Sequence, residues 1–252
     1  MPTPYQSPIA VDTHTHTVLS GHAWSTLLEN IQGGRAHGLA GLVSTEHAFI
    51  MPGAISHFLP GSFPMLPASV EGFRLFYGLE FNILDHHGRI DPYLEKSLPR
   101  VQFGIASIHE LLLPVGSVAQ NTDAYIGAIE NPLIDILGHP DTPSHPCDIP
   151  AVVSAVRQQN KLIEINNNSF VSRPGGQGNC LAFARECKKQ GVRVSVASDA
   201  HFCTAVGRVE KAWEILKEVD FPPELIVNLT LERFSAYMDE RRMEKEVIFA
   251  AP

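Results

Sequence analysis

The chain has 252 residues, 44% of them hydrophobic and 18% charged, which is enough apolar material for a large core and excludes a disordered or fibrous protein. Its 27 acidic residues outnumber the 19 basic ones, giving a formal net charge of -8. No basic cluster could follow a phosphate backbone, so nucleic acid is not expected as the main partner. We expect a cytoplasmic protein that does not contact a membrane, because neither a leader peptide nor an apolar run of roughly 18 residues occurs.

Short segments rich in valine and isoleucine recur from one end of the chain to the other, and each is followed by a stretch of helical character. Seven of them are predicted strands, at residues 9–12, 39–44, 73–79, 101–107, 133–137, 162–165 and 192–197. Strands that are apolar on both faces and alternate with helices form a parallel sheet covered by helices. The sequence therefore predicts a single α/β domain over residues 1–252, folded as a closed or nearly closed barrel, with an open doubly wound sheet as the alternative.

Local signals support helices between these strands. Thr26 and Glu29 have the spacing of a capping box, so a helix is predicted to begin there. Another is predicted to end at Gln190, because Gly191 is a natural helix terminator. Residues 49–69 contain four prolines and are expected to form a long loop over the mouth of the barrel.

Potential metal ligands follow six of the seven predicted strands. They are His14, His16, His22, His47, Glu80, His109, His139, Asp199 and His201. In a parallel barrel the carboxyl ends of all strands open onto one face, so these residues are expected to converge. Nitrogen and oxygen donors dominate and no cysteine stands at a strand exit, which indicates a catalytic, polynuclear metal site rather than a structural one.

The charge of such a site favours an anionic substrate. Three divalent ions would bring +6, and the two acidic ligands Glu80 and Asp199 would leave about +4. A phosphate monoester suits this environment, since metal ions polarise phosphoryl oxygens, generate hydroxide near neutral pH and stabilise the leaving oxygen. The sequence therefore predicts a small anionic phosphorylated substrate.

These residues resemble the ligand motifs of the PHP (polymerase and histidinol phosphatase) family, specifically its YcdX-type phosphatase branch, over nearly the whole chain. The H-x-H after the first strand, the bridging glutamate, the single histidines and the closing D-x-H of the family are all present, so that nine ligand positions are filled. The resemblance implies a distorted (β/α)7 barrel that is TIM-barrel-like and holds three zinc ions per chain. It assigns the first ion to His14, His16, Glu80 and Asp199, the second to Glu80, His109 and His139, and the third to His22, His47 and His201.

Three further features relate to this branch. Glu46 stands where the family commonly has aspartate and is expected to orient His47 less tightly. In the E-I-N-N stretch after the sixth strand, either Asn166 or Asn167 is expected to hydrogen-bond the substrate or to support the barrel rim. Arg173 matches the branch as well and is expected to clamp a phosphate.

The predicted function is a phosphoric monoester hydrolase that acts through a metal-bound hydroxide, with Glu80, Asp199 and Arg173 as its catalytic residues. Histidinol-phosphatase-like activity and 3′-end nuclease activity are alternatives at the same site. An amidohydrolase is a further alternative, although no predicted strand exit carries the lysine usual in that class. A non-catalytic metal-binding module is another. Zinc is the expected cofactor, and manganese or iron could fill some of the sites. The sequence is compatible with a homo-oligomer and does not decide the oligomeric state.

Overall fold

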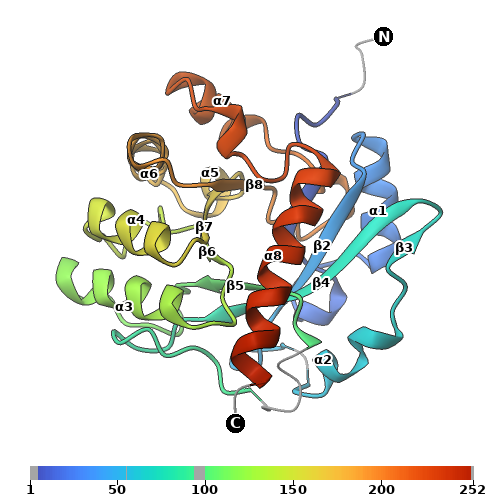
Figure 1. The fold of residues 1–252 in the computed structure, drawn as a ribbon, viewed down its shortest axis with the longest axis horizontal. Coiled ribbons are helices and arrows are strands. Elements are labelled where there is room, and N and C mark those ends of the chain that lie inside the picture. The colour runs from blue at the N-terminus through green and yellow to red at the C-terminus, as the bar shows by residue number, and fades with distance from the viewer. Residues whose placement is uncertain (1–4, 55, 94–99, 251–252) are drawn as a thin grey trace.

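The computed structural model describes residues 5–54, 56–93 and 100–250 (Figure 1). Seven parallel strands follow one another in the order β1-β2-β4-β5-β6-β7-β8, and a short strand, β3, pairs antiparallel with β4. Their bounds are β1 Val11–Thr15, β2 Gly41–His47, β3 Ser69–Val70, β4 Phe73–Asn82, β5 Phe103–Ser107, β6 Ile136–Gly138, β7 Leu162–Asn166 and β8 Val194–Ala197. The seven predicted β/α units are thus confirmed, although β2 and β4 run further than expected and include His47 and Glu80.

The first and last strands meet, so the sheet forms a nearly closed barrel. Thr15 of β1 forms an isolated parallel bridge with Ala200, just beyond β8. Deeper in the seam a side chain takes the place of the backbone ladder: Asn228 Nδ2 donates to the carbonyl oxygens of Val11 at 2.8 Å and Val196 at 2.6 Å, and its Oδ1 accepts from the Val196 N–H. This closure confirms the predicted barrel and excludes the open doubly wound sheet.

Helices lie outside the barrel and at its ends. Their bounds are α1 Leu27–Ala36, α2 Leu59–Ser62, α3 Val118–Glu130, α4 Ile149–Gln158, α5 Ser169–Ser172, α6 Gln177–Gln190, α7 Glu210–Glu218 and α8 Leu231–Ala250. Figure 1 shows α3, α4, α6 and α7 one after another along the outside of β5 to β8. The capping box of Thr26 and Glu29 begins α1, and Gly191 ends α6 with a φ of 70°, as predicted. Among the described residues no helix is both long enough and apolar enough to span a membrane.

The segment at residues 49–69 differs from the loop that its prolines predicted. It contains α2, a 3₁₀ turn at Phe63–Met65 and the first residue of β3. Because Ser69 pairs with Arg74 near the start of β4, the segment has to run from the carboxyl-terminal end of the barrel to the opposite end. Among its described residues, Met51 is the one that lines the pocket at the mouth.

The amino-terminal end of the barrel is closed by α8, drawn red in Figure 1. Its Phe234, Tyr237 and Met238 form one apolar cluster with the early residues of six strands, namely Val11, Val43, Phe76, Phe103, Ile136 and Leu162. The rings of Phe234 and Phe76 meet edge to face at 5.1 Å. With this end filled by apolar side chains, the polar interior of the barrel can reach solvent only at the carboxyl-terminal end.

Candidate metal centre

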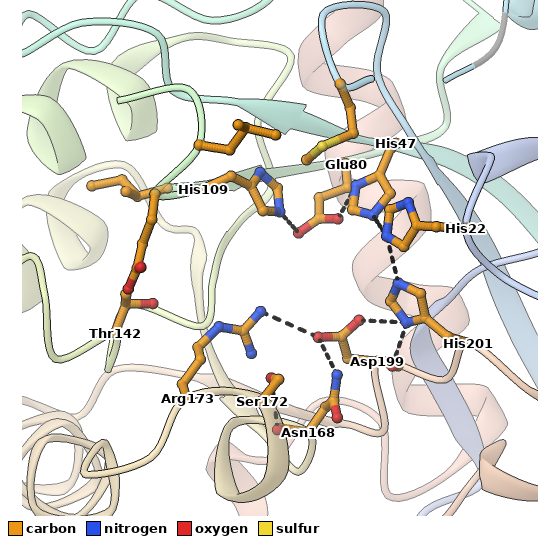
Figure 2. A pocket seen from close by; sticks show the side chains of 14 residues that line it. His22, His47, Glu80, His109, Thr142, Asn168, Ser172, Arg173, Asp199 and His201 are labelled. Atoms are coloured by element: carbon orange, nitrogen blue, oxygen red, sulfur yellow. Dashed lines mark hydrogen bonds and ion pairs between the residues drawn. The ribbon is translucent and has the colours of Figure 1, made fainter. Parts of the chain in front are cut away.

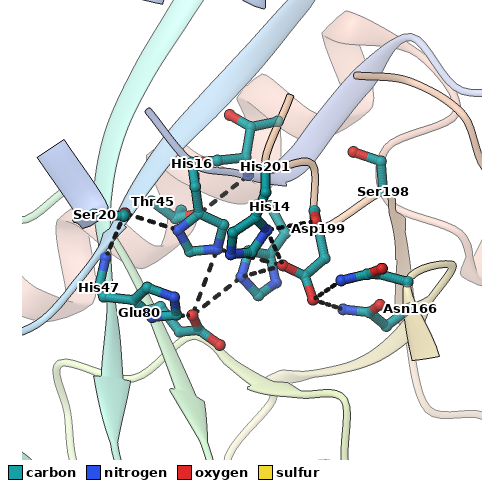
Figure 3. Close-up of polar contacts among 12 residues, drawn as sticks. His14, His16, Ser20, Thr45, His47, Glu80, Asn166, Ser198, Asp199 and His201 are labelled. Carbon is teal, nitrogen blue, oxygen red and sulfur yellow. Dashed lines mark hydrogen bonds and ion pairs between the residues drawn. The ribbon is translucent and has the colours of Figure 1, made fainter. Parts of the chain in front are cut away.

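The structure brings all nine predicted ligands together at the carboxyl-terminal ends of the strands. All of them except His139 are labelled in Figures 2 and 3. His14 belongs to β1, His47 to β2 and Glu80 to β4, where His47 and Glu80 are direct neighbours in the pairing register. The others follow β1, β5, β6 and β8: His16, His22, His109, His139, Asp199 and His201. Convergence at one rim is what a parallel barrel imposes on strand-end residues.

A first group of donors lies deepest in the barrel. His14 Nε2 is 3.4 Å from Glu80 Oε2 and 3.7 Å from Asp199 Oδ1, and His16 Nε2 is 3.5 Å and 3.4 Å from the same two oxygens. All four side chains are buried. Two imidazole nitrogens and two carboxylate oxygens thus face one common point (Figure 3).

Glu80 connects this group to a second one. Its Oε1 is 3.1 Å from His139 Nε2 and 3.5 Å from His109 Nε2, while its Oε2 faces the first group. A single carboxylate therefore turns one oxygen toward each of two donor groups, the geometry of a bridging ligand.

A third group opens toward solvent. His22 Nε2 lies 3.1 Å from His47 Nε2 and 3.2 Å from His201 Nε2, and the chain of contacts is visible along the right of Figure 2. His47 also places its Nδ1 2.8 Å from Glu80 Oε2, so this group adjoins the other two. His22 is exposed, whereas His47 is buried, and this gradient sets the direction from which a ligand would enter.

The spacing and the unmet polar atoms of the site fit metal ions. Donors around a tetrahedral zinc ion with bonds of about 2.0–2.1 Å lie about 3.3 Å apart, close to the 3.1–3.7 Å between donors of each group. His14 Nε2, His16 Nε2, His47 Nδ1 and Glu80 Oε2 are buried and take part in no hydrogen bond within the described residues. Buried polar atoms are otherwise satisfied in folded proteins, so these atoms are suited to bind cations.

Hydrogen bonds on the far side of two rings fix which nitrogen faces the centre. His14 Nδ1 lies 2.8 Å from Glu164 Oε1, and His109 Nδ1 lies 2.7 Å from Asn82 Oδ1, whose amide nitrogen in turn donates to Asp91. Both oxygens can only accept, so each Nδ1 carries a proton and each Nε2 is the nitrogen that faces the centre. Such outer partners are typical of metal-binding histidines.

Glu46 reaches the backbone of His47 indirectly, through Ser20, and no hydrogen bond joins it to the His47 ring among the described residues. Its carboxylate accepts from the Thr17 N–H at 3.0 Å and from Ser20 Oγ at 2.6 Å. Ser20 Oγ in turn lies 3.0 Å from His16 Nδ1 and accepts from the His47 backbone N–H. Glu46 therefore orients the ring of His16 through Ser20 and holds the turn after β1.

Both carboxylates of the centre remain ionised. Burial alone would raise the pKa of Glu80, but the nearby imidazoles of His14 and His47 outweigh it and hold the pKa well below its usual range. Burial opposes ionisation of Asp199 as well, and there the nearby imidazoles of His14 and His16 lower the pKa well below its ordinary value.

Two of the buried imidazoles are held neutral, the state that a metal ligand requires. Burial, together with neighbouring imidazoles, lowers the pKa of His16 well below its ordinary value. Burial and the Arg173 guanidinium lower the pKa of His139 to about 4. Burial would also lower the pKa of His14, but three surrounding carboxylates outweigh it and raise the pKa, so positive charge is favoured at this position.

Two residues of the site adopt backbone conformations that are unusual for side chains with a Cβ. His139 has a φ of 30° and Asp199 a φ of 53°. Left-handed conformations of non-glycine residues cost of order 1 kcal/mol or more and concentrate at functional sites. Here they occur at two of the strand exits that aim a ligand inward.

The centre opens into a pocket of about 510 Å³ that also contains Arg173. Arg173 Nη2 lies 3.5 Å from Asp199 Oδ2, and Nη1 lies 3.4 Å from Ser169 Oγ. Asn168 Nδ2 donates to the same oxygen of Asp199 at 3.4 Å, as Figure 2 shows. A guanidinium group therefore stands beside the donor groups, where an anion in the pocket could reach both.

Of the two roles expected for Asn166 and Asn167, support of the barrel rim is the one that the structure gives to Asn167. Asn167 Oδ1 accepts the backbone N–H groups of Lys211 and Ala212 at the start of α7, so it supports the rim. Asn166 Nδ2 donates to Glu164 at 3.0 Å and lies 3.3 Å from Asp199 Oδ2, inside the barrel. Asn168, which the sequence did not single out, is the asparagine that lines the pocket.

Glu164 is the functional residue that the sequence analysis missed. Its two oxygens accept from His14 Nδ1, from the His139 backbone N–H at 2.7 Å and from Asn166 Nδ2. Two signals were available: an acidic residue among the apolar residues of strand β7, and its place at the start of the E-I-N-N stretch. Because a buried carboxylate needs partners, that residue indicates a polar barrel interior at this level.

We expect Glu164→Gln to lower metal affinity by about 10–100-fold, the usual cost of losing an outer partner of a metal ligand. The two carboxylate oxygens of Glu164 now accept from three donors, whereas glutamine has a single accepting oxygen. We therefore expect the ring of His14 to lose its fixed orientation. Competition with a chelator of known affinity measures the change, with Glu214→Gln on the exposed face of α7 as the matched control. Equal affinities for the two variants would contradict the role of Glu164.

Solved structures with the same fold carry different activities. The histidinol phosphate phosphatase of Lactococcus lactis, solved with zinc, L-histidinol and phosphate, matches with a TM-score of 0.59 and 19% identity over 84% of this chain and 94% of that one. A chain of archaeal ribonuclease P with mature tRNA matches with a TM-score of 0.58 and 15% identity over 92% of this chain and 91% of that one. At such identities the likeness shows the fold alone.

Sequence comparison reaches much nearer relatives. No protein-family model matches the chain. It is 41% identical over 234 residues to a probable phosphatase of Acetivibrio thermocellus, covering 92% of this chain and 96% of that protein. It is 42% identical over 239 residues to a probable phosphatase of Clostridium botulinum, covering 94% and 97%. With such identity over nearly the full length of both proteins, the chain belongs to the family of bacterial probable phosphatases that these two represent.

Proposed function

We propose that the protein is a metal-dependent phosphatase that hydrolyses small phosphate monoesters at a centre of three divalent ions, and that it is a member of the YcdX-type branch of the PHP family. One observation carries this proposal: three groups of imidazole and carboxylate donors adjoin a single carboxylate, Glu80, in a pocket that also holds Arg173. The names of the relatives support phosphate ester hydrolysis.

Each group of donors would hold one ion. The first comprises His14, His16, Glu80 and Asp199, the second Glu80, His109 and His139, and the third His22, His47 and His201. Imidazole-rich sites suit zinc, and the Lactococcus lactis neighbour was solved with zinc, so we propose zinc as the metal. Manganese or iron is the alternative for positions with carboxylate ligands.

The reaction would proceed without a nucleophilic side chain. Divalent ions bound there would polarise phosphoryl oxygens and activate water. Hydrolysis breaks the bond between phosphorus and the ester oxygen; water supplies the new oxygen on phosphorus and a proton for the departing alcohol, so the products are the alcohol and inorganic phosphate. Arg173 would hold two phosphoryl oxygens in its planar fork, and Asn168 would add a neutral donor beside it.

Metal analysis of gently purified protein, followed by phosphatase assays, tests the proposal. We expect about three ions per chain, phosphate release from a panel of monoesters that includes histidinol phosphate, loss of release after chelation, and its return on adding zinc or manganese. Chelation should also lower the melting temperature, because a ligand that binds only the folded state stabilises it.

Two outcomes would overturn parts of this proposal. One ion or fewer per chain would refute the centre of three ions. Three tightly held ions without release of phosphate from any ester would instead support a non-catalytic metal-binding module.

A further inference from the structure

Beyond the metal donors, the pocket has two chemically different linings. The polar lining consists of Thr142, Asn168, Ser172 and Arg173, which follow β6 and β7. The apolar lining consists of Met51, Ile108 and Leu111, which follow β2 and β5. Because β2, β4 and β5 are adjacent in the barrel and β6 and β7 come next, each lining occupies its own arc of the rim. A molecule with its phosphoryl group at the centre therefore meets polar groups on one arc and hydrocarbon on the other.

Leu111 is the part of the apolar lining that is available to a ligand. Its side chain is 71% exposed, whereas Met51 and Ile108 are buried and form a base beneath the pocket surface. A ligand that covers such a surface removes apolar area from water, which contributes about 25 cal/mol per Å². The non-phosphate part of a substrate gains from this contact only if it is itself apolar.

Glu110 places a negative charge on the same arc as the apolar lining. It lines the pocket next to Leu111, is exposed, and accepts a hydrogen bond of 2.5 Å from Ser144 Oγ. Among the described residues that line the pocket, Arg173 is the one permanent cation, and it belongs to the other arc. A second negative charge carried on the apolar arc would therefore approach Glu110, while Arg173 and the metal donors lie elsewhere in the pocket.

We propose, on the basis of the phosphatase function inferred above, that the substrate is the phosphate monoester of a compact, partly apolar alcohol that carries no second negative charge. The phosphoryl group lies between the metal centre and Arg173, and the hydrocarbon part lies against Leu111. Polyanions such as nucleic acid ends and sugar bisphosphates are disfavoured by Glu110.

Three phosphate esters test the effects of apolar contact and of a second negative charge: butyl phosphate, glycerol 3-phosphate and 4-phosphooxybutanoate. All three are esters of primary alcohols, so their leaving groups are similar. With the metal-loaded enzyme, we expect kcat/KM for butyl phosphate to exceed both others by roughly tenfold, the usual size of discrimination by an apolar pocket. Leu111→Ser should lower the preference for butyl phosphate over glycerol phosphate by about 3–10-fold, mainly through KM. Glu110→Gln should lower the discrimination against the carboxylate ester.

Val247→Ser is the matched control, because Val247 is an equally exposed apolar residue on α8 at the opposite end of the barrel. It should keep the wild-type ratios. Release of phosphate from all three esters with equal kcat/KM, or a Leu111→Ser variant that keeps the full preference, would overturn this inference and leave the phosphatase function standing. No release from any ester would overturn both.

Discussion

Replacing Glu80 by glutamine is expected to lower kcat/KM for a phosphate monoester by about 10³-fold and to reduce the metal content below three ions per chain. The reason is the position of its two oxygens, which face His14 and His16 on one side and His109 and His139 on the other. Glutamine has nearly the same shape but presents an amide donor to one of the two groups and removes the negative charge from both.

Elemental analysis and steady-state kinetics on the same preparation measure this effect. Glu218→Gln, at an exposed carboxylate on α7, should keep wild-type metal content and turnover. Comparing the melting temperatures of the metal-free forms separates a loss of ions from a loss of fold. Unchanged metal content together with unchanged turnover in Glu80→Gln would refute the bridging role.

The second large effect is expected at Arg173. Arg173→Ala should lower kcat/KM by about 10²–10³-fold and weaken inhibition by inorganic phosphate, while the metal content stays the same, because the guanidinium lies beside the donors and is not one of them. Arg173→Lys should recover only part of the activity, since an ammonium group supplies the charge without the planar fork that holds two oxygens.

Kinetics with one ester and inhibition by inorganic phosphate provide the measurement. Arg185→Ala, at an exposed arginine on α6, is the control for the removal of a positive charge. If Arg173→Ala retained wild-type affinity for inorganic phosphate, the guanidinium would not contact the phosphoryl group, and the proposed clamp would be wrong.

The barrel and the identity of the converging residues could be predicted because both depend on local patterns. Apolar strands alternate with helices along the whole chain, and donors such as His14 and His16 stand at strand exits, where a parallel barrel leaves only one place for them. The alternation of strands and helices, together with the position of each donor at the end of a strand, is enough to predict that the donors converge. Details of side-chain packing are not needed.

The outer partners of the ligands could not be predicted in the same way. Glu164 reaches His14 across 150 positions of sequence, and Ser20, in the turn after β1, connects Glu46 of β2 to His16. The local sequence indicates that an acidic residue inside an apolar strand faces a polar interior, but not which ring its carboxylate meets. The connection from Glu46 to the backbone N–H of His47 through Ser20 is likewise visible only in the structure.

The course of residues 49–69 shows a different limit. Four prolines correctly argue against a long helix or strand, but they carry no information about direction. Pairing of Ser69 with Arg74 is a tertiary contact, and it leads the segment away from the mouth. The position of α8 across the amino-terminal end of the barrel could not be predicted either, because the residues that Phe234 contacts come from strands spread over most of the chain.

The seam between β1 and β8 has a consequence for biosynthesis. The carboxylate of Asp12 accepts from Ser198 and from the N–H of Gly207, and Asn228 completes the joint, so partners almost two hundred positions apart must meet. Asp199 and the ring of His14 lie on opposite sides of that joint. The residues of the candidate metal centre therefore cannot all come together on a nascent chain until translation has passed Asn228.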